Sequence, residues 1–187
     1  MRNERAAWVL TGGQSRRMGT DKAFLATASG PLATRVARLA AQVCDTVSLV
    51  GDPGKYGVLG LRVIPDNFPG MGPLSGIEAA LHATEAEWNL VLACDMPSLD
   101  AETLEFLFRD MAGFDCSVPR HADGKLEPLC AVYNRRCHPL IRAALTRGTR
   151  RVTEALAPFR VRYVETVREE VFTNWNTPQD LTDHPHG

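Results

Sequence analysis

Short apolar segments without strict polar alternation recur through the first half of this chain. Four of them run from Ala6 to Leu10, Thr46 to Val50, Leu61 to Ile64 and Trp88 to Ala93. A strand is continuously apolar when both faces of its sheet are covered by other elements. The pattern therefore predicts strands that are buried on both sides.

Between these segments, apolar residues recur at helical spacing. The stretch from Pro31 to Cys44 predicts an amphipathic helix, and proline is favoured at the start of a helix. The apolar face of this helix consists of Leu32, Val36, Leu39, Ala40 and Val43. The same spacing predicts further helices over residues 73–82, about 100–111 and about 136–147. Strands and helices thus alternate along the chain.

This alternation predicts an α/β fold with three layers, in which helices cover both faces of a mostly parallel sheet. In the second half, DCSVPR and PLCAVY flank a polar turn that contains Asp123 and Gly124, which predicts a hairpin or a pair of strands. No repeat or linker interrupts the 187 residues. We therefore expect a single domain over residues 1–187, with ligands bound at the carboxyl ends of the strands.

Composition narrows the function classes. The net charge of −1, with acidic and basic residues interspersed, argues against a non-specific nucleic-acid binder. No apolar run approaches the roughly 20 residues that cross a bilayer, so we expect a cytoplasmic protein without a membrane partner. The five cysteines are scattered and never form a CxxC pair, which argues against a disulfide framework or a zinc site.

The segment from Val9 to Lys22, VLTGGQSRRMGTDK, has the character of a phosphate-binding loop. Glycines allow the backbone N–H groups to approach anionic oxygens, and the basic side chains supply positive charge; these residues are Gly12, Gly13, Gly19, Arg16, Arg17 and Lys22. Neither a Walker A motif nor GxGxxG can be aligned here. The alternative is a solvated turn that happens to carry basic residues.

A second motif, LVLACDMP, delivers Asp95 to the carboxyl end of an apolar strand. A lone carboxylate there suits Mg²⁺, which takes one or two protein carboxylates and fills its octahedron with phosphates and waters. The alternative role for Asp95 is a cap of the following helix, although Ser98 and Asp100 stand closer to that helix start.

Two further motifs are less specific. The loop VIPDNFPGMGPLSG contains Asp66, Gly72 and Gly76 and would form one wall of a nucleotide pocket, or else an ordinary turn before a helix. In FTNWNTPQDL, Asn174 and Asn176 lie on the same side of an extended segment and can converge on one ligand. The alternative makes Asn176 or Thr177 the N-cap of a short last helix.

With these motifs in order, the sequence resembles the molybdenum cofactor guanylyltransferases of the MobA-like nucleotidyltransferase family. The resemblance runs from about Trp8 to about Leu181 and rests on LTGGQSRRMGTDKAFL, IPDNFPGMGPLSG, CDMP and NWNTPQDL. It implies a Rossmann-like nucleotidyltransferase fold whose N-terminal part binds nucleotide and whose C-terminal part binds the cofactor substrate. The implied reaction transfers GMP from GTP to the terminal phosphate of molybdenum-molybdopterin and releases pyrophosphate.

The resemblance also implies roles for individual residues. Leu10, Thr11, Gly12 and Gly13 would hold the guanosine and its phosphates, although the family usually has alanine in place of Thr11. Lys22 would contact the phosphates, and Asp66 would lie against the nucleoside, with Gly76 in the same pocket. Asp95 would carry Mg²⁺. Asn174 and Asn176 would lie on the side of the pterin substrate.

The chemistry of nucleotidyl transfer agrees with these roles. Catalysis consists mainly of positioning and charge neutralisation, which Arg17, Lys22 and a metal on Asp95 can provide. The basic residues Arg120, Lys125, Arg150 and Arg151 are candidates for binding the second anionic substrate, or are solvated surface charges. Expected partners are GTP, molybdenum-molybdopterin, and cofactor delivery proteins or recipient molybdoenzymes.

Two other functions fit the same motifs. One is a CTP-dependent molybdopterin cytidylyltransferase, in which the first loop typically reads Leu-Ala-Ala-Gly and the Pro-Leu-Ser-Gly pattern is absent. The other is a catalytically silent nucleotide-binding partner, which would not need both Lys22 and Asp95. The motifs of this chain favour the guanylyltransferase.

Overall fold

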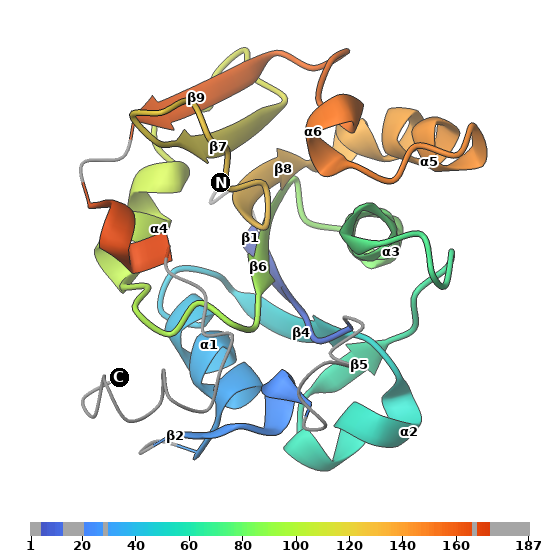
Figure 1. The fold of residues 1–187 in the computed structure, drawn as a ribbon, viewed down its shortest axis with the longest axis vertical. Helices are drawn as coiled ribbons and strands as arrows, with labels where there is room; N and C mark the ends of the chain where they lie inside the picture. The colour runs from blue at the N-terminus through green and yellow to red at the C-terminus, as the bar shows by residue number, and fades with distance from the viewer. Residues whose placement is uncertain (1–4, 13–20, 28–29, 166–167, 173–187) are drawn as a thin grey trace.

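The computed structural model describes residues 5–12, 21–27, 30–165 and 168–172. Its centre is a seven-stranded sheet in the order β5-β4-β1-β6-β8-β7-β9 (Figure 1). The bounds are β1 Arg5–Leu10, β4 Thr46–Val50, β5 Arg62–Ile64, β6 Trp88–Ala93, β7 Cys116–Arg120, β8 Cys130–Asn134 and β9 Val161–Glu165. A separate antiparallel pair consists of β2 Ala26–Thr27 and β3 Gly30–Pro31.

The sheet is mostly parallel, as the sequence predicts. β1 pairs in parallel with β4 and β6, β4 with β5, and β7 with β9. β8 alone runs the other way, because it pairs antiparallel with both β6 and β7. The carboxyl ends of the remaining strands therefore share one edge of the sheet.

Helices cover both faces of the sheet, which confirms the three-layer α/β class. α1 Leu32–Ala40 and α4 Ala101–Leu107 lie on one side of the sheet, and α3 Pro73–Ala83, α5 His138–Thr146 and α6 Val152–Ala155 lie on the other (Figure 1). The short α2 Pro53–Tyr56 follows β4. The remaining helical turns are η1 Lys22–Phe24, η2 Gly57–Leu59, η3 Arg135–Cys137 and η4 Glu169–Phe172.

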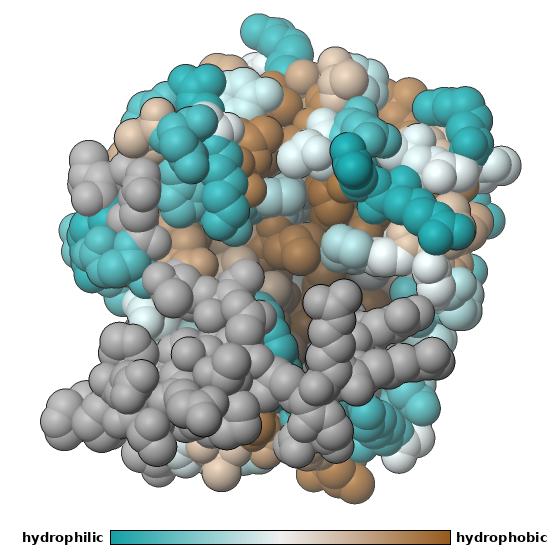
Figure 2. Space-filling model, viewed as in Figure 1, coloured by the Kyte–Doolittle hydropathy of each residue, from teal (hydrophilic) through white to brown (hydrophobic). Residues whose placement is uncertain are grey.

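The apolar β1 segment shows why both faces are covered. Ala7 and Val9 belong to the core beneath α1 and α4, whereas Ala6, Trp8 and Leu10 belong to the core beneath α3 and α5. Side chains of a strand alternate between faces, so a continuously apolar strand supplies two cores at once. Figure 2 shows hydrophobic residues at the centre of this face of the molecule, between hydrophilic side chains.

Most predicted elements form, but several helices end earlier than their apolar pattern. α1 ends at Ala40 and not at Cys44. α4 ends at Leu107. Asp110 then has a left-handed backbone conformation with φ of 49°, which is incompatible with continuation of an α-helix. α5 begins at His138 directly after the single turn η3, which agrees with the predicted start at about residue 136.

The predicted strand pair around Asp123 and Gly124 is confirmed, since β7 and β8 are antiparallel. Gly124 has φ of +85°, and its N–H donates to the His121 carbonyl at 2.9 Å. The pattern did not predict β9, which pairs along the whole of β7. β9 is an edge strand whose side chains are mostly half-buried or exposed, so it lacks the continuous apolar run that marks the inner strands.

All five cysteines are buried free thiols, as the scattered spacing predicts for a chain without a disulfide framework. Burial raises the pKa of the Cys94 thiol, which follows β6, to about 12, so this thiol stays protonated. Among the described residues, no helix combines the length and apolarity needed to span a bilayer.

Candidate active site

A half-buried ion pair lies where the chain order of the sheet reverses. From β1 the chain builds β4 and β5 on one side, and it then returns to place β6 on the other side of β1. Such switch points, at the carboxyl ends of the strands, form the ligand crevices of open α/β sheets. Lys22 follows β1 in the chain and Asp95 follows β6, and the Lys22 ammonium lies 2.8 Å from Asp95 Oδ2.

Local structure aims Lys22 at this point. Asp21 caps the single turn η1 by accepting a hydrogen bond from the Ala23 N–H at 3.0 Å, and Ala23 is fully buried. The side chains of Lys22 and Asp95 are only 17% and 19% exposed, so the pair is partly shielded from water. Reduced screening by water strengthens the attraction between the two charges.

The helix-cap alternative for Asp95 is not what the structure shows. Asp100 is the N-cap of α4, and its carboxylate accepts the Thr103 N–H at 2.8 Å. Asp95 therefore remains available for the ion pair with Lys22. Its carboxylate has acceptor capacity beyond that one contact, since a carboxylate offers about four lone-pair sites.

The end of β1 is held in place by its neighbour β4 and by α2. Thr11 is buried, and both its N–H and its Oγ1 donate to the Val50 carbonyl at 3.0 Å. The Tyr56 hydroxyl lies 2.9 Å from the Thr11 carbonyl oxygen and 2.7 Å from Asp21 Oδ2. Tyr56 thus connects Thr11 with Asp21, the residues on either side of the glycine-rich segment.

The protonation states of Asp21 and Tyr56 stabilise the hydrogen bond between them. Burial opposes ionisation of Asp21, but hydrogen bonds from Lys55 and Tyr56 outweigh it and lower the pKa of the carboxyl. Burial, followed by the contact with Asp21, raises the pKa of Tyr56, so the phenol stays protonated and can donate. Sequence reasoning missed Tyr56 and Asp21, because only the fold brings α2 against η1.

The Asp66 loop is tied to the start of α3. Asp66 Oδ1 accepts the Phe68 N–H at 2.8 Å and also the Ser75 hydroxyl. Gly72 caps α3 with φ of 80°, and a side chain there would face the Arg150 carbonyl at 3.7 Å. The basic pair that begins at Arg150 therefore lies beside this loop.

Gly76 has a packing role in addition to the predicted place in the pocket. A Cβ at Gly76 would lie 3.0 Å from Leu10 Cδ2, so the glycine allows α3 to pack closely against β1. The Leu10 side chain is itself buried in that core, which leaves its backbone for any contact with a ligand.

Several predicted residues lie outside the part of the chain that the structure describes. They are Gly13, Arg16, Arg17, Gly19, Asn174 and Asn176. Of the predicted residues that are described, Thr11, Gly12, Lys22 and Asp95 gather around the ends of β1 and β6, and Asp66 and Gly76 belong to the neighbouring loop and helix. Arg120 is paired with Glu165, and Lys125 with the buried Glu127.

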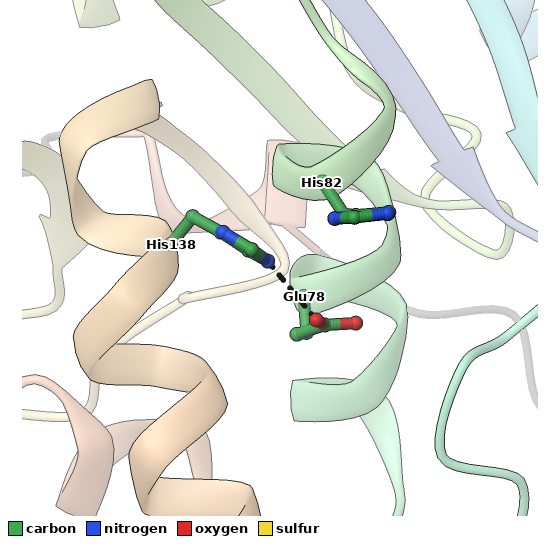
Figure 3. Close-up of side chains that lie close together, drawn as sticks. All are labelled: Glu78, His82 and His138. Atoms are coloured by element: carbon green, nitrogen blue, oxygen red, sulfur yellow. Dashed lines mark hydrogen bonds and ion pairs between the residues drawn. The ribbon is translucent and has the colours of Figure 1, made fainter.

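A second cluster of metal-binding residue types lies between α3 and α5, apart from the predicted motifs. It consists of Glu78, His82 and His138, whose potential ligand atoms all lie within 4.8 Å of one another (Figure 3). The signal that could have found it is the spacing of four between Glu78 and His82, which places both on one helix face. His138 comes from another helix, so spacing cannot include it.

Comparisons with known proteins identify the family of this chain and agree with the fold. The MobA-like NTP transferase domain family matches residues 7–161. A probable molybdenum cofactor guanylyltransferase of Pelotomaculum thermopropionicum is 40% identical over 181 residues, covering 92% of this chain and 88% of the relative. Another of the same name, from a Nostoc species, is 36% identical and covers 96% of this chain and 89% of the relative.

Solved structures show the same architecture. A molybdopterin-guanine dinucleotide biosynthesis protein A from Archaeoglobus fulgidus superposes with a TM-score of 0.80 at 29% identity and covers 95% of both chains. A 2-C-methyl-D-erythritol 4-phosphate cytidylyltransferase from Thermus thermophilus has a TM-score of 0.71 at 15% identity, with 95% of this chain and 96% of that chain covered. At that identity the second likeness concerns the fold alone.

Proposed function

This chain belongs to the MobA-like NTP transferase family, and from that premise we propose that it transfers GMP from GTP to the terminal phosphate of molybdenum-molybdopterin. The products are pyrophosphate and the guanine dinucleotide form of the cofactor. The observation that carries the proposal is the shielded Lys22–Asp95 pair at the switch point, 2.8 Å between Nζ and Oδ2. It supplies one cation for phosphate and one carboxylate for a metal at the place where the fold binds ligands.

The proposed reaction needs charge neutralisation more than it needs a nucleophilic side chain. A terminal phosphate oxygen of molybdopterin attacks the α-phosphorus of GTP in line with the departing pyrophosphate, so the P–O bond to the acceptor forms as the bond to pyrophosphate breaks. The Lys22 ammonium compensates the charge that develops on the phosphate oxygens. A phosphate monoester is largely ionised near neutral pH, so no strong general base is required.

Asp95 is the residue proposed to hold Mg²⁺. The donor set fits, since a carboxylate with acceptor capacity beyond its ion pair lies beside the Lys22 ammonium, and Mg²⁺ takes its other ligands from phosphates and water. When bound, Mg²⁺ supplies additional charge neutralisation and orients the pyrophosphate. Lys22 and Asp95 are then the two groups that orient the triphosphate.

Nucleotide binding is proposed at the ends of β1 and β5. The backbone of Thr11 is anchored by Val50 and Tyr56, which fixes the start of the adjoining Gly12, whose N–H is proposed to bind phosphate. The loop of Asp66 is fastened to α3 by Ser75, and this loop is proposed as the wall against the nucleoside. Arg150 and Arg151 are exposed beside Gly72 and are proposed to meet the pterin phosphate.

The purified protein tests this proposal in a pyrophosphate-release assay with molybdopterin cofactor and Mg²⁺. We expect release from GTP to exceed release from CTP by at least about 100-fold, the size of discrimination that an unpaired base edge can produce. An equal rate or a preference for CTP would indicate the cytidylyltransferase. Binding of GTP without any release would indicate the silent nucleotide-binding protein.

A further inference from the structure

We propose that Glu78, His82 and His138 form a binding site for one divalent transition-metal ion, with Zn²⁺ as the best fit. Glu78 and His82 lie one turn apart on α3, and His138 is the first residue of α5. Their potential ligand atoms lie within 4.8 Å of one another. Figure 3 shows His138 reaching across from α5 to Glu78, with His82 on the next turn of α3.

The separation between the two principal ligands suits a shared ion. His138 Nε2 lies 3.0 Å from Glu78 Oε1, where the two groups now share a hydrogen bond. Zinc bonds to nitrogen and carboxylate oxygen are about 2.0–2.1 Å long, so one ion bridging these atoms makes an angle of roughly 90–95°. Opening that angle to a tetrahedron moves the atoms apart by only a few tenths of an ångström, on the order of ordinary side-chain adjustment.

Glu78 is a buried carboxylate, and its negative charge requires compensation by neighbouring groups. Its side chain is 0% exposed, and it receives hydrogen bonds from Asn67 at 2.9 Å and Arg142 at 2.8 Å in addition to His138. A buried carboxylate is costly unless it is paired with a cation or a metal. Arg142 is 51% exposed, so its guanidinium can turn into solvent when a metal ion supplies the compensating charge.

The ligand types select the class of ion. Imidazole nitrogens suit Zn²⁺, Cu²⁺ and Ni²⁺, whereas Mg²⁺ requires an octahedron of oxygens. His82 is exposed and His138 half-buried, so the site has an entry path from solvent. Three protein ligands leave a fourth position for water. The proposed site is therefore chemically distinct from the one proposed at Asp95.

Titration of the metal-stripped full-length protein with Zn²⁺, in competition with a chromophoric chelator, tests the proposal. We expect one equivalent to bind, and H82A and H138Q each to weaken the affinity at least 10-fold, since each removes a ligand. Titration with Co²⁺ should give the visible absorption bands of a tetrahedral site. H82A changes an exposed side chain and should remain folded, as circular dichroism checks.

The control is H184A/H186A, which removes the two histidines near the end of the chain and should leave the affinity unchanged. H121N is the second control, because His121 contacts the buried Glu127 at another place. Zn²⁺ affinity that is equal in wild type and H82A/H138Q overturns the proposal. Binding that disappears in either control variant places the ion elsewhere and overturns it equally.

Discussion

At the scale of single residues, the candidate site depends on a few contacts that motifs predict only in part. Lys22 and Asp95 were predicted from a glycine-rich loop and from a carboxylate at a strand end, and the fold brings them to 2.8 Å. Tyr56 could not be predicted, because its hydroxyl joins Thr11 and Asp21 across 45 and 35 residues of sequence. Neither motif spacing nor periodicity predicts contacts between residues so far apart in the sequence.

The Tyr56 hydroxyl gives a direct prediction. Y56F retains the ring, which stacks on Phe24 with centroids 5.7 Å apart, but removes the bond between the two sides of the loop. We expect the KM for GTP to rise several-fold and the free energy of unfolding to fall by about 1 kcal/mol, the net worth of one buried hydrogen bond. Steady-state kinetics and urea unfolding measure both.

Y163F is the matched control, because Tyr163 is 43% exposed on the edge strand β9. It should change neither quantity. A Y56F protein with the wild-type KM for GTP would show that the connection between Thr11 and Asp21 does not position the nucleotide.

At the scale of elements, the inner strands were predictable and the helix ends were not. β1, β4 and β6 match their apolar segments because both of their faces are covered. The end of α4 depends on the left-handed Asp110, and β9 depends on an edge position beside β7. Both are properties of the assembled layers and leave no periodic signal in the sequence.

The junction of β1, β4 and α2 has no space for a side chain at Gly51. A Cβ there would lie 2.8 Å from the Tyr56 ring and would also collide with Thr11. We expect G51A to lower the free energy of unfolding by about 1–3 kcal/mol, the usual cost of overpacking a buried site. Chemical denaturation measures the change.

G57A is the control for the same substitution. Gly57 has helical φ of −59°, and an added Cβ meets nothing within 4 Å. Its stability should stay within about 0.5 kcal/mol of wild type. Equal stability of G51A and wild type would contradict the close packing of Tyr56 against the end of β4.

At the scale of the whole molecule, the α/β class and the mostly parallel sheet followed from alternation of apolar segments and helical periods. The strand order did not follow from that alternation, because β8 lies between β6 and β7 as an antiparallel strand. The local pattern of apolar residues predicts which segments are strands, whereas the order of the strands in the sheet depends on how the helices and strands pack together. The switch point between β1 and β6 became visible only with that order.

Acid stability is a property of the whole molecule to which Asp115 contributes. Burial raises the pKa of this carboxyl, but the Arg160 N–H and the Arg136 guanidinium outweigh burial and lower it below its usual value. The resulting stability is present above the pKa of the unfolded chain and is lost as pH falls through the lower pKa of the folded protein. The loss therefore begins from about pH 5 downward.

We expect D115N to be less stable than wild type at pH 7 and to lose less stability on acidification, because the substituted side chain does not titrate. D110N is the control, since Asp110 is exposed and asparagine also adopts its left-handed backbone. Thermal unfolding at a series of acidic pH values gives the slope of stability against pH for each protein. Identical slopes for D115N and wild type would contradict the assignment.

Lys22 and Asp95 are the groups proposed to orient the triphosphate in guanylyl transfer, and one measurement tests this role most directly. Wild-type protein and D95N are incubated with molybdopterin cofactor, Mg²⁺ and GTP labelled at the α-phosphate, and the labelled dinucleotide product is quantified. We expect product from the wild type and a loss of at least about 100-fold in folded D95N. Equal product from both proteins would contradict the account.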